Sequence, residues 1–168
     1  MKIRSERDFN YSVDKAVTVF FESGDSYDMN ELENVTQWKV VKEEDFGDRR
    51  VGTKEWCAHS QIPKALQPII NPKMLTWFEH SEWNRKTRVY SFTIEPHFLH
   101  KQVKCTGKTA YIDKGPNKSG RIFEMTLKVD IPIFGPMLEN LVQGILKKNE
   151  EQDFILSAKS LDKVYGGK

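Results

Sequence analysis

The segment from Phe134 to about Val164 restricts the fold of this chain more than any other part of the sequence. Its apolar residues recur at steps of three and four, which places them on one face of a helix: Leu138, Leu141, Val142 and Ile145. Gly135-Pro136 suits the first turn of a helix, and Gly166-Gly167 suits its end. Such a helix is roughly 46 Å long at about 1.5 Å per residue. Because the preceding segments resemble strands, we expect it to lie across a curved antiparallel sheet.

A polar interruption divides this apolar stripe. At about 100° per residue, Asn149 and Gln152 continue the apolar line, and Leu156 resumes it. Polar groups that face inward are costly unless they find partners, which here would be water or a ligand. The other interpretation is that the helix bends near Lys147 and leaves both residues in solvent. A second stripe on nearly the opposite side favours that interpretation: Phe154, Ala158 and Leu161.

The rest of the chain predicts one strand, two short helices and then six further strands. The first strand is predicted over residues 3–11, and the helices over 12–24 and 28–34, with Ser12 as the first N-cap. The later strands are predicted over 36–46, 49–60, 74–83, 87–96, 99–113 and 120–132. Residues 62–72 contain Pro63, Pro68 and Pro72, which exclude a central strand and favour a packed loop or short helix.

Alternation in the last three strands predicts which side chains face inward. These are Tyr90, Phe92 and Ile94, then Val103, Cys105, Thr109 and Tyr111, then Phe123, Met125, Leu127, Val129 and Ile131. One wet face and one buried face are typical of an antiparallel sheet covered on one side. The sequence therefore predicts an α+β fold.

Composition limits the class of protein. The 168 residues suffice for one domain with a hydrophobic core, over residues 1–168. The 26 basic residues are interspersed among 24 acidic ones, so a net charge of +2 argues against nucleic acid as a partner. Two cysteines do not make a disulfide framework. The start MKIRSERDF is not a signal peptide, and no run approaches about 18 apolar residues, so we expect a cytoplasmic protein.

Two stretches and the terminal helix carry a resemblance to a known superfamily. The stretches are FNYSVDKAVTVFF and GRIFEMTLKVDIPIFGPMLENLV. With the helix, they resemble the START-like superfamily, also called Bet v 1-like, helix-grip or SRPBCC, over the full length. The join IPIFG resembles an uncharacterised bacterial branch, and IPKALQPIINPKMLTWFEHSEWN is loosely similar to PRELI-type lipid-transfer proteins. The resemblance implies a sheet wrapped around the last helix with a hydrophobic cavity between them. Relatives bind or carry lipids, sterols and other apolar molecules, and a minority are enzymes.

Reactive side chains form no recognisable catalytic or metal motif. His97 and His100 follow Glu95, but third and fourth ligands at workable spacing are missing, so no metal is predicted. Cys105 is interpreted as a small buried hydrophobe. Phosphate-binding and nucleophile-elbow motifs are missing too, so we predict no cofactor and assign no catalytic residue.

Outward lysines have two interpretations. They are Lys101, Lys104, Lys108 and Lys128. The simpler interpretation is a solvated face of the sheet. The alternative is transient contact with an anionic membrane surface, which a lipid carrier requires. The sequence indicates no oligomeric state.

The inward residues are the predicted lining of a ligand cavity, since apolar walls with a few polar contacts are typical of small-molecule sites. The candidates are Trp56, Trp77, Tyr90, Phe92, Cys105, Tyr111, Phe123, Met125, Leu138, Leu141, Ile145, Asn149 and Gln152. We expect binding or transport of a hydrophobic small molecule or lipid between the sheet and the terminal helix, with Tyr111, Asn149 and Gln152 orienting its polar head.

Two alternative functions stay open. One is an enzyme of the cyclase, hydrolase or aromatase type, with Tyr111 or a histidine as acid–base group. The other is an interaction domain with a filled core.

Overall fold

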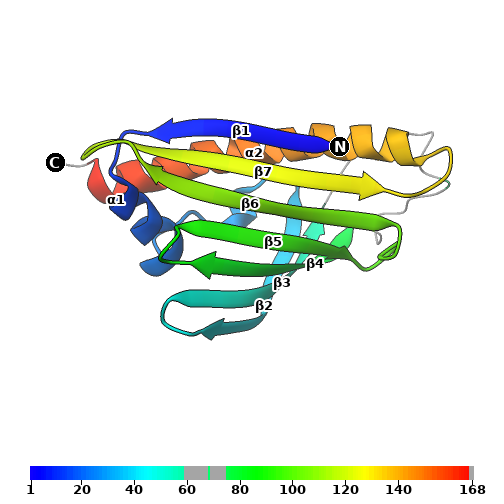
Figure 1. Cartoon of the computed structure of the whole chain (residues 1–168), viewed down its shortest axis with the longest axis horizontal. Helices are drawn as coiled ribbons and strands as arrows, with labels where there is room; N and C mark the ends of the chain where they lie inside the picture. Colours follow the sequence, from blue (N-terminus) through cyan, green and yellow to red (C-terminus); the bar gives the residue numbers. More distant parts are fainter. Residues whose placement is uncertain (59–67, 69–74, 167–168) are drawn as a thin grey trace.

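A seven-stranded antiparallel sheet is the main element of the computed structural model, which describes residues 1–58, 68 and 75–166 (Figure 1). The strands are β1 (Lys2–Phe9), β2 (Val35–Asp45), β3 (Arg49–Ala58), β4 (Thr76–Asn84), β5 (Val89–Pro96), β6 (Val103–Asp113) and β7 (Ser119–Val129). Their order across the sheet is β1-β7-β6-β5-β4-β3-β2, so β1 pairs with the last strand and β2 forms the other edge. The predicted α+β class and antiparallel sheet are confirmed. Apart from Pro68, the predicted loop or short helix over 62–72 lies outside the described residues.

The helices follow the predicted order, but the two short ones are shorter or less regular than predicted. They are α1 (Val13–Val17), a π-helical turn η1 (Thr18–Glu22), a 3-10 turn η2 (Met29–Glu31) and α2 (Gly135–Tyr165). The side chain of Ser12 accepts a hydrogen bond from Lys15 N at 3.4 Å, which confirms the predicted N-cap. The predicted helix over 28–34 is too long. Asp28 and Glu31 form a capping box around a single turn, and β2 begins at Val35.

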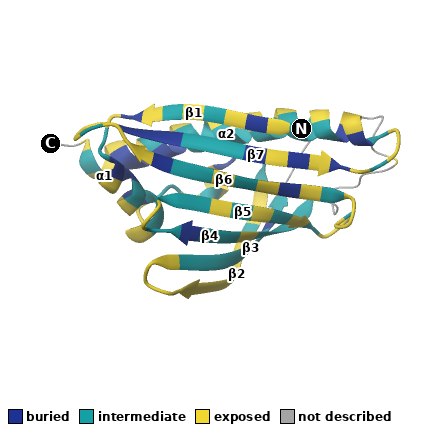
Figure 2. Ribbon diagram, viewed as in Figure 1, coloured by how far each residue is buried: buried dark blue, intermediate teal, exposed yellow. Residues whose placement is uncertain are grey.

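The long helix α2 lies closest to the β1–β7 side of the sheet. It contacts β7, β1 and η1, and Figure 1 shows β5 to β2 extending away from it. Buried residues accordingly concentrate on β7, whereas β2 is exposed along nearly its whole length (Figure 2). None of the described helices has a stretch long and apolar enough to cross a membrane.

The hydrophobic core is divided into two clusters. The first joins the beginning of α2 to the sheet and contains Ile3, Cys105, Met125, Leu127, Val129 and Leu138. The second joins α1 to the end of α2 and contains Phe9, Val13, Ala16, Val19, Trp83, Tyr111 and Leu161. Leu138, Leu141 and Val142 of the first stripe pack in the first cluster, whereas Phe154, Ala158 and Leu161 of the second stripe pack in the second cluster. The polar interruption, residues 147–153, lies between them.

Candidate functional site

Strands β3 to β6 present a row of aromatic side chains on the face that carries the core. Register pairs Trp56 with Trp77 and Tyr90 with Trp83, and it places Phe92 opposite Gly107. The alternation of the strands puts these side chains on the same face. Trp77, Tyr90 and Phe92 are only half-buried. We call this surface, formed by Trp56, Trp77, Glu79, Tyr90 and Phe92, the inner wall.

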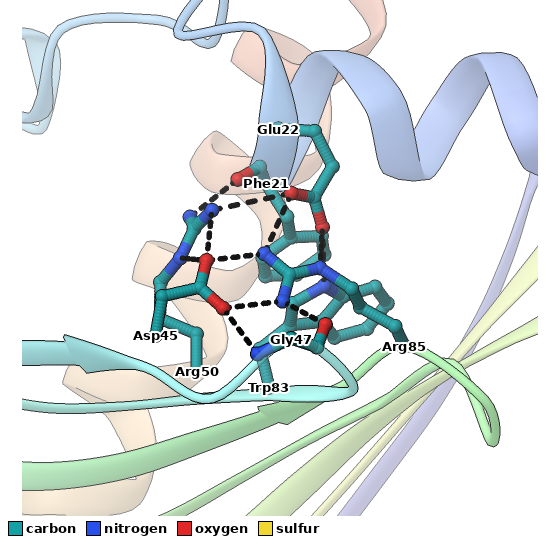
Figure 3. A network of polar contacts seen from close by, with 7 residues as sticks. All are labelled: Phe21, Glu22, Asp45, Gly47, Arg50, Trp83 and Arg85. Carbon is teal, nitrogen blue, oxygen red and sulfur yellow. Dashed lines mark hydrogen bonds and ion pairs between the residues drawn. The ribbon is translucent and has the colours of Figure 1, made fainter.

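A network of ion pairs closes one end of the inner wall (Figure 3). Arg85 lies between Glu22 of η1 and Asp45 of β2, with N···O distances of 2.9 and 2.7 Å. Trp83 Nε1 also donates to Glu22 at 2.8 Å, and the ring of Phe21 stacks on Trp83 with centroids 3.9 Å apart. Hydrogen bonds from Arg85 hold the pKa values of Glu22 and Asp45 below their ordinary range. These contacts fix η1 over the Trp83 end of the wall.

A carboxyl group stands among the rings of the inner wall. The hydroxyl of Tyr90 donates to Glu79, and no ion pair joins Glu79 to a residue of the described chain. Burial, and then the charge and hydrogen bond of Glu79, raise the pKa of Tyr90 well above its ordinary value. Burial, and then Glu79, raise the pKa of Cys105 to about 12. Phenol and thiol are therefore neutral near pH 7, and the carboxyl group supplies the acceptor oxygens.

Trp56 adds a donor to the same surface. Its indole Nε1 is buried and has no hydrogen-bond partner among the described residues. Buried donors without partners are uncommon because the lost bond to water is not replaced. The inner wall therefore offers a donor at Trp56 without a partner among the described residues and acceptor oxygens at Glu79. Lys54 lies directly opposite Glu79, with its ammonium 5.9 Å from the ring centroid of Tyr90.

The polar interruption of α2 bonds to the segment between η2 and β2. Asn34 Nδ2 donates to Asn149 Oδ1 at 2.7 Å. Glu33 N donates to Gln152 Oε1 at 3.0 Å, and Gln152 Nε2 donates to Glu31 O at 3.1 Å. Both side chains are half-buried. Their polar atoms thus meet the chain itself, an arrangement that neither sequence interpretation included.

The other predicted residues divide between the two clusters. Phe92, Cys105, Phe123, Met125, Leu138 and Leu141 belong to the first, and Tyr90 and Tyr111 belong to the second. Tyr111 is buried among rings, with centroids of Phe20 at 5.8 Å and Phe21 at 5.5 Å. Ile145 is half-buried and belongs to neither cluster.

A buried arginine beneath α2 was missed by the sequence reasoning. Arg121 is 3% exposed and pairs with Glu150 at 3.0 Å and with Asp153, which also accepts from Tyr27. Burial alone would lower the pKa of Arg121, but Asp153 and the other acidic groups around it raise the pKa. Its guanidinium lies 5.5 Å from the ring centroid of Phe154. The arginine thus attaches the middle of α2 to β7.

His80 of β4 and His97, just after β5, lie on the outer face of the sheet. His80 bonds to Thr53 Oγ1 at 3.1 Å and to Glu95 at 2.9 Å, beside a hollow of about 570 Å³ lined mostly by outward residues. His97 lies 3.4 Å from Glu55. A histidine acid–base group from these positions would face away from the inner wall. Within the described part of the chain, no three His, Cys, Asp or Glu residues are grouped to hold a metal ion.

Comparison with known proteins identifies a family and a fold. Residues 5–155 match the family described as "Protein of unknown function (DUF2505)", and no curated protein matches the sequence. The protein TTHA0849 from Thermus thermophilus is similar in structure, with a TM-score of 0.71, 20% identity, and 98% of this chain and 99% of that chain covered. Norcoclaurine synthase from Thalictrum flavum, in complex with dopamine and hydroxybenzaldehyde, is similar as well. Its TM-score is 0.66 at 15% identity, and 96% of this chain and 87% of that chain are covered.

A START superfamily protein from Mycobacterium smegmatis is also similar, with a TM-score of 0.59, 8% identity, and 97% of this chain and 98% of that chain covered. At these identities the likeness establishes the fold alone. The fold is START-like, or Bet v 1-like, as the sequence resemblance predicted.

Proposed function

We propose that this chain, which belongs to the family described as protein of unknown function DUF2505, binds a hydrophobic small molecule or lipid on its inner wall. The observation that carries the proposal is the half-buried state of Trp77, Tyr90 and Phe92 on a face whose described contacts with α2 are most numerous beside β1 and β7. Removing apolar surface from water contributes about 25 cal/mol per Å². An apolar ligand against these rings would therefore gain affinity from burial.

The polar groups of the wall suggest what the ligand carries. A hydroxyl or amide group would donate to Glu79 and accept from Trp56 Nε1, which has no partner among the described residues. Asn149 and Gln152 remain proposed contacts, but a ligand that reached them would displace their bonds to residues 31–34. The remaining proposed lining consists of Phe92, Cys105, Tyr111, Phe123, Met125, Leu138, Leu141 and Ile145.

Tyr90 would serve the ligand as a hydrogen-bond donor rather than as a base, because burial raises the pKa of its phenol well above the ordinary value. Similarity to a synthase that binds dopamine and hydroxybenzaldehyde supports a small-molecule site in this fold. Turnover of a retained molecule would favour the enzyme alternative.

Native mass spectrometry and a probe titration test the proposal. We expect the purified protein to retain an apolar molecule, or to bind N-phenyl-1-naphthylamine with saturable fluorescence. Trp77→Ala should weaken probe binding about tenfold, because it removes part of the apolar wall. Phe78→Ala is the matched control, since Phe78 is the next residue of β4 and faces outward. Equal effects of the two substitutions, or no binding by either method, would contradict the proposal.

A further inference from the structure

Two loops at one end of the sheet expose large apolar side chains. The β5–β6 loop (97–102) and the β7–α2 loop (130–134) adjoin, because Asp130 N donates to Gln102 O at 2.8 Å. Phe98 is 41% exposed and Ile133 is 88% exposed. Both loops lie at the right-hand end of the molecule in Figures 1 and 2. These side chains add nothing to either core cluster, so their exposure calls for another explanation.

The backbone of the same loops is strained at apolar residues. Leu99 has φ of 60° and Ile133 has φ of 68°. A β-branched residue with left-handed φ is an outlier, because its Cβ approaches the backbone too closely. Such strain is typical of functional sites. At Ile133 an unfavourable conformation coincides with nearly complete exposure.

The outer face beside these loops carries unpaired positive charge. Lys104 lies directly opposite Lys128 in the β6–β7 register, and both are exposed. Neither they nor Lys101 take part in an ion pair with a described residue, whereas Lys108 pairs with Glu124 at 3.0 Å. Like charges placed directly opposite repel each other. A bound anion would relieve this repulsion.

We propose that this end of the molecule docks on an anionic lipid bilayer. Phe98 and Ile133 would enter the interfacial region, while Lys101, Lys104 and Lys128 contact lipid phosphate groups. Exposed apolar side chains beside basic ones have the composition that binds anionic membrane surfaces. Trp77 pairs with Pro96, just before the first loop, so docking would bring the Trp56–Trp77 end of the inner wall near the membrane.

Vesicle sedimentation tests this surface. The full chain should bind phosphatidylglycerol vesicles and not phosphatidylcholine vesicles, and binding should weaken with salt. The double substitution Lys104→Glu/Lys128→Glu should weaken binding at least about 25-fold, since each basic residue near an anionic surface contributes a factor of about 5. Ile133→Asp should also weaken it, because a charge replaces the side chain that enters the bilayer.

Two controls match these variants in charge change. Lys159→Glu/Lys163→Glu reverses two exposed charges near the other end of α2, and Val41→Asp changes an exposed residue of the β2 edge. Both should bind vesicles like the wild type. Failure of the wild type to bind phosphatidylglycerol, equal binding to phosphatidylcholine, or equal losses in variants and controls would overturn the inference. Naphthylamine binding measured without vesicles should be unchanged in Ile133→Asp, so the docking surface and the ligand site can fail separately.

Discussion

The ring of Phe92 lies against the backbone of Gly107, its direct cross-strand neighbour. A Cβ atom added at Gly107 would lie 2.4 Å from Cζ of Phe92 and 2.9 Å from the carbonyl oxygen of Glu124. The missing side chain leaves room for the ring, which also stacks with Phe123 at a centroid distance of 6.2 Å. Gly107 therefore determines how Phe92 sits in the inner wall.

Gly107→Ala should lower the free energy of unfolding by about 1–3 kcal/mol, because the methyl group displaces the ring. Urea unfolding measures this change. The same substitution made in a Phe92→Ala background should cost less, since the ring is then missing. Equal costs in both backgrounds would mean that contact with the backbone at Glu124, and not with the ring, is limiting.

Arg121→Met should lower the free energy of unfolding by about 3–5 kcal/mol, because Glu150 and Asp153 would lose their buried cation. Lys104→Met is the control, since this lysine is exposed and forms no ion pair with a described residue. Chemical denaturation compares the two variants. A loss below about 1 kcal/mol for Arg121→Met would show that the network does not attach α2 to β7.

Asn149→Leu/Gln152→Leu should destabilise the fold by about 1–3 kcal/mol, because Glu33 N and Asn34 would lose their partners. Hydrogen exchange should become faster at the Glu33 amide and stay unchanged at the Leu127 amide, which bonds to Met1 O. Unchanged stability together with weaker naphthylamine binding would instead indicate that the two polar residues contact ligand.

Acid should remove the stability that Arg85 provides. Arg85 lowers the pKa of Glu22 below 4.5 and that of Asp45 below 3.8. Carboxylates with lowered pKa stabilise the folded state above their ordinary pKa values, and the contribution is lost as the pH falls through the lowered ones. Arg85→Met should therefore melt at a lower temperature than the wild type at neutral pH, and the difference should shrink below pH 3.8. A difference that is constant with pH would exclude this role of the ion pairs.

Local patterns predicted the sheet and α2 because each pattern reports burial along one segment. Met125 and Leu127, assigned inward by alternation, are buried in β7. The helix predicted from about Phe134 to Val164 spans Gly135–Tyr165. Arg121 also had a signal, since it shares the inward parity of Met125. A charged residue at such a position indicates a buried partner, although the pattern does not identify that partner.

Contacts between distant segments could not be predicted from local sequence patterns. The partners of Asn149 and Gln152 lie in residues 31–34, and the helical pattern showed only that two polar residues continue an apolar line. Likewise, Glu79 follows the alternation of Trp77, but its bond to Tyr90 depends on the pairing of β4 with β5. Alternation gives the face of each side chain, but the register of a hairpin also depends on its turn, which the alternation does not specify.

The indole N–H signals of the four tryptophans test the ligand-binding inner wall most directly. Trp56 and Trp77 pair at one end of the wall, whereas Trp83 is bonded to Glu22 at the other end. In nitrogen–proton correlation spectra recorded during titration with N-phenyl-1-naphthylamine, the signals of Trp56 and Trp77 should shift and saturate. The Trp83 signal should stay in place. Probe fluorescence that rises while the Trp56 and Trp77 signals remain unchanged would contradict the account.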